Sequence, residues 1–418
     1  MQIFFIAILY NSKILCNFAI NNEPTKSCIM EISELKKAFL EAYGQDASAV
    51  FFSPGRVNLI GEHTDYNGGH VFPCALSFGT YLLIAPNNYC QWRFKSLNML
   101  DIVAVDVTCT PNILPNNSWV NYPLGVFAQF LKNGVAIESG YDILIWGNVP
   151  AGAGLSSSAA LEVVTAFALN HVLKTNLDRT QLALYGQAAE HEYAGVNCGI
   201  MDQFASAQGK KDHAIDLDCS TLQFELVPVK LNGMKVVIAN THSPHKLDFG
   251  SYNARVAQCQ EALAQIRALG FPQLENLAQL SQADFDSIAD RITDPVAKMR
   301  ARHVVGEVAR TNEAIAALKK GDIVRFGQLM NQSHTSLRDD YEVTGPELDA
   351  LAEAAWKVDG IIGSRMTGGG FGGCTVSIVR DETIDLFIEQ VSKEYTQRTG
   401  LKADFYIAQI GDGAKQLE

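Results

Sequence analysis

The sequence lacks an excess of basic residues and any long uninterrupted hydrophobic run. Its 33 Lys and Arg residues stand against 45 Asp and Glu residues, giving a net charge of −12. This balance argues against a general nucleic-acid-binding protein, because neutralising phosphates requires clustered basic side chains. A nucleotide ligand is compatible with it, since backbone N–H groups can hold phosphate. No segment reaches the ~18 continuous apolar residues of a membrane-spanning helix, so no membrane association is expected.

Cysteine pairs are also missing. The nine cysteines are scattered, none forms a CxxC pair, and no spacing resembles that of a zinc finger. An odd, unclustered set is typical of reduced thiols in a reducing compartment, which predicts a cytoplasmic protein. The opening MQIFFIAILY is apolar, but it lacks a preceding basic region and a small-residue cleavage site, and it is too short to cross a bilayer. We therefore expect residues 1–29 to be an N-terminal extension outside the fold.

The length of 418 residues suggests two domains, at ~100–200 residues each. No internal repeat or clear linker is found, and a soft boundary is placed near 220–233. Hydrophobic periodicity predicts helices over 31–44, from about 159, over 179–194 and over most of 251–358. It predicts strands at SAVFFS (48–53), YLLIAP (81–86), DIVAVDV (101–107), 141–147 and 234–240. The stretch VNCGIMDQFAS (196–206) is predicted to be a loop.

A glycine-rich turn between a predicted strand and a predicted helix reads PAGAGLSSSAALE (150–162). Gly152 and Gly154 allow the backbone to approach a ligand closely, and the first N–H groups of the helix lie at the positive end of its dipole, which favours phosphate. Ser156, Ser157 and Ser158 add hydroxyls for phosphate oxygens or a magnesium ion. The turn lacks a GxxxxGK[ST] motif and a complete dinucleotide fingerprint. A capped helix after a tight turn is the structural alternative.

A second glycine-rich stretch, MTGGGFGGC (366–374), has five glycines in six positions and precedes a β-branched run. Glycine at this density is costly in a regular element unless positive φ angles or a close backbone approach require it. Two interpretations stay open at this point. One is a loop that contacts a ligand, and the other is a tight turn packed against a helix.

The stretch GRVNLIGEHTDYNGG (55–69) concentrates hydrogen-bonding groups. Glu62, His63 and Asp65 offer several acceptors and one donor or acceptor within four residues, which suits a polyhydroxylated ligand. A metal site is the first alternative, although the spacing is not a strong metal-binding pattern and no second His/Asp cluster completes it. A salt-bridged surface turn is the second.

Together these stretches resemble the GHMP kinases, which phosphorylate small-molecule alcohols, and GRVNLIGEHTDYNGG resembles the signature of the galactokinase family. Further similar stretches are SWVNYPLG (118–125), NCGIMDQFAS (197–206), GSYNARVAQC (250–259) and RARHVVGE (300–307). The resemblance extends from about residue 31 to the C-terminus. It implies a two-domain α+β GHMP-kinase fold with an N-terminal domain at 30–225, a C-terminal domain at 226–418 and the active site in the interdomain cleft.

The resemblance also implies roles for individual residues. Asp202 is the catalytic aspartate that accepts the proton of the sugar's anomeric hydroxyl, and Arg56 beside it stabilises negative charge. The implied sugar-binding residues are Glu62, His63, Asp65, Gly199 and Tyr252. The implied ATP-binding residues are Gly152, Gly154, Leu155, Ser156, Ser157, Ser158 and, near the adenine, Trp119. The implied magnesium ligands are Ser158 and Glu190.

The activity implied is the phosphorylation of α-D-galactose by ATP, which gives α-D-galactose 1-phosphate and ADP, with ATP as co-substrate and Mg²⁺ as cofactor. We expect a monomer. An N-acetylgalactosamine kinase is one alternative, although it would need room for an acetamido group. A non-catalytic sensor of galactose and ATP is the other, and it would be expected to disturb the phosphate loop, whereas Ser156 to Ala160 are intact here.

Overall fold

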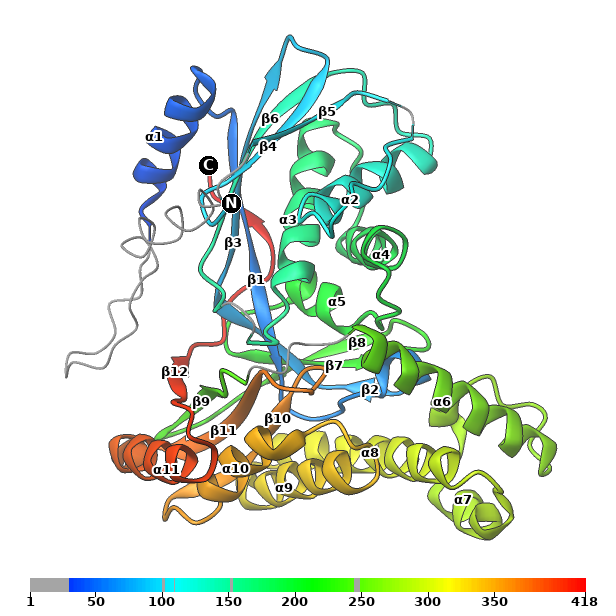
Figure 1. The fold of residues 1–418 in the computed structure, drawn as a ribbon. Coiled ribbons are helices and arrows are strands. Elements are labelled where there is room, and N and C mark those ends of the chain that lie inside the picture. Colours follow the sequence, from blue (N-terminus) through cyan, green and yellow to red (C-terminus); the bar gives the residue numbers. More distant parts are fainter. Residues whose placement is uncertain (1–29, 100–101, 109, 151–152, 244–248) are drawn as a thin grey trace, which may run out of the picture.

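The computed structural model describes residues 30–99, 102–108, 110–150, 153–243 and 249–418 (Figure 1). It combines three β-sheets with helices that cover them, which confirms the predicted α+β class. The expected extension 1–29 lies outside the described residues. No helix in the described part of the chain is both long and apolar enough to cross a membrane.

The first sheet has six strands in the order β13-β1-β3-β6-β4-β5 (Figure 1). Neighbouring strands are antiparallel, except that β4 and β6 run parallel. The register of β1 shifts between Pro54 and Arg56, and such a bulge re-aims the side chains that follow it. The strands are β1 (Ala49–Asn58), β3 (Pro73–Asn87), β4 (Gln91–Ser96), β5 (Ile102–Asp106), β6 (Gly140–Gly147) and β13 (Lys415–Gln416).

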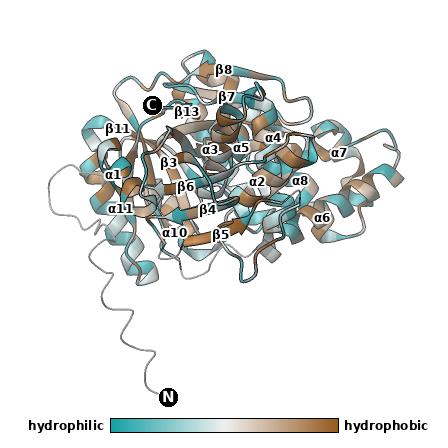
Figure 2. Ribbon diagram, turned by 90° about the horizontal axis from the view of Figure 1, so that it is seen from above, coloured by the Kyte–Doolittle hydropathy of each residue, from teal (hydrophilic) through white to brown (hydrophobic). Residues whose placement is uncertain are grey.

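Helices cover both faces of this sheet, and α1 lies across β3 and β6 from α3 in the view from above (Figure 2). Successive side chains of a strand point to opposite faces. Val50 of β1 accordingly packs with the α1 residues Leu35 and Phe39, while Phe51 packs with Leu169 on the other face. The helices are α1 (Ile32–Tyr43), α2 (Asn121–Lys132), α3 (Ser157–Val172), α4 (Arg179–Ala189) and α5 (Met201–Gln208).

The second half of the chain builds an antiparallel sheet in the order β10-β11-β9-β12, with helices beneath it (Figure 1). Its strands are β9 (Met234–Asn240), β10 (Ile361–Thr367), β11 (Cys374–Arg380) and β12 (Asp404–Ala408). The helices are α6 (Phe249–Ala268), α7 (Gln282–Ile288), α8 (Pro295–Lys319), α9 (Ile323–Asp339), α10 (Gly345–Ala355) and α11 (Ile384–Thr399). A small sheet contains β2 (His70–Val71), β7 (His213–Asp218) and β8 (Phe224–Pro228).

Two local predictions need correction. The stretch 196–206, predicted to be a loop, becomes helix α5 from Met201 onward. Met201, Phe204 and Ala205 are buried in one apolar cluster. Their i, i+3, i+4 spacing gives this short helix a side that faces the core, although Gly199 before it favoured the prediction of a loop. The helix predicted over 179–194 is α-helical only to Ala189 and ends in a π-helical turn, Glu190–Ala194.

The C-terminal strand β13 belongs to the first sheet and not to the second. Lys415 and Gln416 of β13 pair with Phe52 and Phe51 of β1, so the C-terminus returns to the first sheet. The domain limits 30–225 and 226–418 stay a prediction, with the limit falling inside β8.

Candidate active site

Arg56 lies just beyond the bulge of β1 and joins two segments of the first half. Its Nε and Nη2 donate to the two carboxylate oxygens of Asp202, each over 2.7 Å, and its Nη1 donates to the carbonyl oxygen of Gly154 over 2.8 Å. Asp202 lies in the first turn of α5. A two-pronged guanidinium–carboxylate pair fixes both groups in direction as well as distance, so the two residues predicted to be catalytic are held together.

The glycine-rich stretch at 150–162, which the sequence predicts to be a phosphate loop, runs into the first turn of α3. Gly154 and Ser156 have φ angles of +67° and +60°, and the hydroxyl of Ser156 donates to Oδ2 of Asp202 over 2.5 Å. No side chain caps the N-terminus of α3, so its first N–H groups are available to an anion. Leu155 is buried and Ser157 is exposed. Gly152 lies outside the described residues.

The predicted magnesium ligands are adjacent. The Ser158 hydroxyl donates to Oε1 of Glu190 over 3.0 Å. Burial, and then the charge of Asp202, raise the pKa of Glu190 to about 7. Within the described residues, no group of three or more His, Cys, Asp or Glu side chains could hold a metal ion. Two hard oxygen donors fit Mg²⁺, which is usually bound by one or two protein ligands together with substrate phosphates and water.

Asp65 begins a short 3-10 turn, Asp65–Asn67, and packs tightly on Gly199. A Cβ atom at Gly199 would lie 2.1 Å from Oδ2 of Asp65, so only glycine leaves room for this carboxyl group. Burial, and then the charge of Asp202, raise the pKa of Asp65 to about 7. The structure thus brings together Asp65, Gly199 and Asp202, which the sequence had assigned to one substrate.

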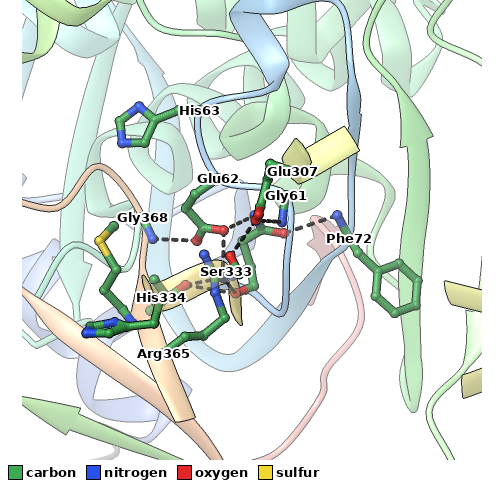
Figure 3. Close-up of polar contacts among 12 residues, drawn as sticks. Gly61, Glu62, His63, Phe72, Glu307, Ser333, His334, Arg365 and Gly368 are labelled. Atoms are coloured by element: carbon green, nitrogen blue, oxygen red, sulfur yellow. Dashed lines mark hydrogen bonds and ion pairs between the residues drawn. The ribbon is translucent and has the colours of Figure 1, made fainter. Parts of the chain in front are cut away.

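Glu62 is 1% exposed and held by three donors (Figure 3). Its Oε1 accepts from the Gly368 amide over 2.8 Å, and its Oε2 accepts from Asn58 Nδ2 over 2.6 Å and lies 2.6 Å from Nη1 of Arg365. Burial raises the pKa of Glu62, and Arg365 opposes that rise. The alternative of a salt-bridged surface turn is therefore wrong for Glu62, which is buried.

His63 is buried beside Glu62 and has a φ angle of +62°. Burial lowers the pKa of His63 to about 3, so the imidazole is neutral at physiological pH. Its Nε2 lies 3.2 Å from the Gly369 carbonyl oxygen and its Nδ1 lies 2.8 Å from the Tyr66 hydroxyl. Since the carbonyl can only accept, Nε2 carries the proton and Nδ1 accepts. The Tyr252 ring lies 5.6 Å from the rings of His63 and Tyr66.

The glycine-rich loop after β10 lies against the phosphate loop. Gly368 has a φ angle of +85°, and a Cβ atom there would lie 2.8 Å from the Gly154 carbonyl oxygen and 3.5 Å from Nη2 of Arg56. A Cβ atom at Gly373 would lie 3.2 Å from the Ala153 carbonyl oxygen. Close backbone approach therefore explains these glycines, and the loop joins the second half of the chain to the site.

Trp119 lies in the turn before α2 and packs, partly buried, against the first apolar cluster. None of its described contacts reaches the phosphate loop, so its place near adenine stays a prediction.

The sequence interpretation missed several residues that support Glu62. Asn58 links Glu62 to the amide of Phe72 through Oδ1, and Arg365 reaches Glu62 from β10. Glu307 of α8 accepts from the Gly61 amide over 3.0 Å. A signal existed for two of them, because Asn58 interrupts an apolar Val-Asn-Leu-Ile step and Arg365 is the single charged residue of β10.

Comparison with known proteins defines the class first. The galactokinase galactose-binding signature matches residues 37–86, the N-terminal domain of the GHMP kinases matches residues 121–210, and their C-terminal domain matches residues 314–397. The mevalonate kinase of Methanococcus jannaschii has the same fold, with a TM-score of 0.61 at 18% identity over 87% of this chain and 98% of that one. The fold is that of a GHMP kinase.

More similar proteins narrow the assignment. The galactokinase of Fusobacterium nucleatum is 50% identical over 88% of this chain and 95% of its own length, and that of Bacillus subtilis is 46% identical over 92% and 99%. The crystal structure of Lactococcus lactis galactokinase complexed with galactose superposes with a TM-score of 0.89, at 42% identity over 92% of this chain and 100% of that chain. The chain belongs to the galactokinase family and is a kinase.

Proposed function

We propose that this chain transfers the terminal phosphoryl group of ATP to the anomeric hydroxyl of α-D-galactose, giving α-D-galactose 1-phosphate and ADP. The observation that carries the proposal is the unit formed by Arg56, Asp202 and Ser156, because it places a fixed carboxylate at the open N-terminus of α3. Asp65 lies close enough to Asp202 to feel its charge, and Gly199 packs against Asp65. The relative crystallised with galactose supports that sugar as the acceptor.

Asp202 orients the acceptor hydroxyl. A carboxylate has about four lone-pair positions, and Arg56 and Ser156 occupy three of them with donated hydrogen bonds. One position on Oδ1 is left for the sugar hydroxyl. Because phosphoryl transfer passes through a loose transition state, positioning and charge stabilisation matter more than early proton removal. Asp202 therefore holds the hydroxyl in line and takes its proton late, while Arg56 keeps the carboxylate in place.

The phosphates of ATP are assigned to the first turn of α3, which contains Ser157 and Ser158 and whose N–H groups are not capped by a side chain. Ser158 and Glu190 would hold a magnesium ion, which neutralises charge on the outer phosphate oxygens when bound. Glu62, His63 and Tyr252 are assigned to the sugar side of the site. The monomeric state and the cytoplasmic location stay predictions.

The test is ATP consumption by the purified protein with magnesium across galactose, glucose, N-acetylgalactosamine and mevalonate. Turnover with galactose and not with the other three is expected. Turnover with N-acetylgalactosamine in preference to galactose would replace the acceptor and keep the phosphate site. Tight galactose binding without ADP release would contradict a kinase and favour a sensor.

A further inference from the structure

Arg365 is a fully buried arginine at the end of β10, where it faces the sugar-binding stretch from the second half of the chain (Figure 3). Its Nη1 lies 2.6 Å from Oε2 of Glu62 and donates to the Asn58 carbonyl oxygen over 3.2 Å. Among the described residues, its Nε and Nη2 have no hydrogen-bond partner. Burying a guanidinium with unmade hydrogen bonds disfavours folding, so stability alone does not account for this residue.

Glu307 is the other carboxylate near Arg365, but its partners come from elsewhere. Arg310 donates to its Oε2 over 2.8 Å, and Ser333 and the Gly61 amide donate to its Oε1. Arg365 makes no hydrogen bond to Glu307, and its printed contacts go to Glu62 and Asn58. Arg365 therefore pairs with Glu62, and it does not neutralise Glu307 of α8 through a direct hydrogen bond.

The strand that carries Arg365 is itself fixed. β10 is the edge of its sheet, and side chains of α9 occupy its free edge: Asn331 accepts from the Ser364 amide over 2.9 Å and His334 accepts from the Met366 amide over 3.1 Å. The Thr367 hydroxyl accepts from the Asn58 amide over 2.9 Å. A guanidinium on a strand bonded on both sides of it has little freedom to move, as a positioning group requires.

Three donors constrain Glu62, and they leave one acceptor position. Asn58 and Arg365 occupy Oε2, and the Gly368 amide occupies one lone pair of Oε1. Of about four lone-pair positions, only one on Oε1 is left. If Arg365 did not hold Oε2, the carboxylate could rotate and exchange its oxygens, and that acceptor would lose its direction.

We propose that Arg365 is a positioning residue for galactose, acting through Glu62: it holds one carboxylate oxygen so that the other presents a single directed acceptor to a sugar hydroxyl. This inference rests on the proposed function. It assigns Arg365 to the sugar and not to ATP, although Arg365 lies three residues before the glycine that contacts the phosphate loop.

The test is the kinetics of Arg365→Met with both substrates varied. Loss of one directed hydrogen bond to a charged group predicts a rise of about 10–100-fold in the galactose KM. The ATP KM should change by less than about twofold, because no ATP contact is lost. Galactose affinity measured by calorimetry provides the same readout without turnover, so a wild-type protein that binds galactose but does not phosphorylate it would refute the proposed function and still test Arg365.

A double-mutant cycle with Glu62→Gln separates positioning from general damage. If Arg365 acts through Glu62, Arg365→Met should add little to the galactose KM in the Glu62→Gln background. Fully additive effects, or an unchanged galactose KM and affinity in folded Arg365→Met, would overturn the proposal.

The matched control is Arg93→Met. Arg93 also pairs with a buried carboxylate, since its Nε and Nη2 donate to Asp142 over 2.6 and 2.7 Å, but it lies on β4 of the first sheet. This control should lower stability and leave both KM values unchanged. If Arg365→Met does not fold, Arg365→Lys serves in its place: it keeps the charge without the planar fork, and its galactose KM should still rise, whereas an unchanged value would overturn the proposal.

Discussion

Asp202 and Arg56 are held as one unit, because the guanidinium donates to both carboxylate oxygens and also to the phosphate loop. Among the single residues of the site, most hydrogen-bonding positions are already occupied by protein partners. Glu62 has three donors, and both nitrogens of His63 are engaged by Tyr66 and Gly369. Few acceptor positions remain, so each one left open has a defined direction toward the ligand.

Asp202→Ala is expected to abolish turnover, by about 10³-fold or more, while ATP binding changes little. The reason is that the acceptor of the sugar hydroxyl disappears, whereas the uncapped N–H groups of the first turn of α3 are kept. Steady-state assays of ADP release measure turnover, and calorimetry measures ATP affinity. The control is Asp284→Asn, in the first turn of the remote helix α7, and near-normal turnover of Asp202→Ala would remove its assigned role.

Gly199→Ala should weaken galactose binding and spare ATP binding. The new Cβ atom would lie 2.1 Å from Oδ2 of Asp65, which forces that carboxyl group away from its place beside Asp202. Gly147→Ala is the matched control, because the nearest atom to a Cβ there is 3.6 Å away. Isothermal calorimetry with galactose should show a clear loss, about tenfold or more, for the first variant only. Equal affinities would mean that Asp65 does not contact the sugar.

At the level of secondary-structure elements, the glycine-rich loop after β10 connects the proposed sugar side of the site to its proposed phosphate side. The amide of Gly368 holds Glu62, and its Cα approaches the Gly154 carbonyl so closely that a Cβ atom would lie 2.8 Å from it. One loop from the second half therefore touches both binding stretches of the first half. A disturbance here should not be selective for one substrate.

Gly368→Ala is accordingly expected to raise the KM for both galactose and ATP and to lower kcat. Part of the damage would be backbone strain at a φ angle of +85°, about 1–2 kcal/mol. Gly400→Ala controls for that part, since Gly400 has a φ angle of +74° with nothing within 4 Å of a Cβ. The control should lose stability and keep its kinetics. A Gly368→Ala enzyme that behaves like Gly400→Ala would show that the loop contact is dispensable.

Helix α8 contributes a pH-dependent term to stability through His303. Burial lowers the pKa of His303 to about 4 from an ordinary value of 6.5, so the unfolded chain binds one more proton than the folded chain between these values. The stabilisation is fully present above pH 6.5 and is lost as pH falls toward 4. His303→Gln should make the unfolding free energy less pH-dependent in this window. The number of protons taken up on unfolding should fall by up to about one. Urea unfolding of both proteins at pH 7 and pH 5 measures this change in unfolding free energy. The same change in wild type and in His303→Gln would contradict the assignment.

At the scale of the whole molecule, the C-terminus closes the first sheet after the second half has been completed. Besides the β13 pairing, the Val50 amide donates to the Glu418 carbonyl over 2.9 Å and the Leu417 amide donates to the Val50 carbonyl over 2.8 Å. The same strand β1 carries Arg56. The C-terminal residues therefore stabilise the strand that carries Arg56.

Removing Lys415 to Glu418 should lower the unfolding free energy by about 2–4 kcal/mol, because several backbone hydrogen bonds to β1 are lost. Lys36→Ala is the control, since the exposed Lys36–Glu418 ion pair contributes only ~0–1 kcal/mol. Thermal unfolding of the two variants separates strand pairing from the ion pair. Equal melting temperatures would show that β13 adds nothing to the first sheet.

Helices and strands that have a local sequence pattern could be predicted from the sequence alone. The helix predicted over 31–44 forms as Ile32–Tyr43, capped by Gly44, and the strand predicted over 234–240 forms at those residues, because periodicity, caps and turns are properties of neighbouring residues. The α+β class and the kinase family were also predicted, because the stretches 55–69, 150–162 and 366–374 occur in one chain and together resemble that family. Helix α5 was missed because it is only eight residues long, which gives too short a window for a helical period to stand out.

How the site residues face one another depends on the packing of the whole chain. Asp65 against Gly199, and Glu62 against Gly368 and Arg365, join segments that are far apart along the chain. No local pattern records such contacts, because they depend on how two sheets and their helices pack. The residue types in the motifs thus come from the sequence, whereas burial, the engaged lone pairs and the raised or lowered pKa values arise when packing removes water from those groups.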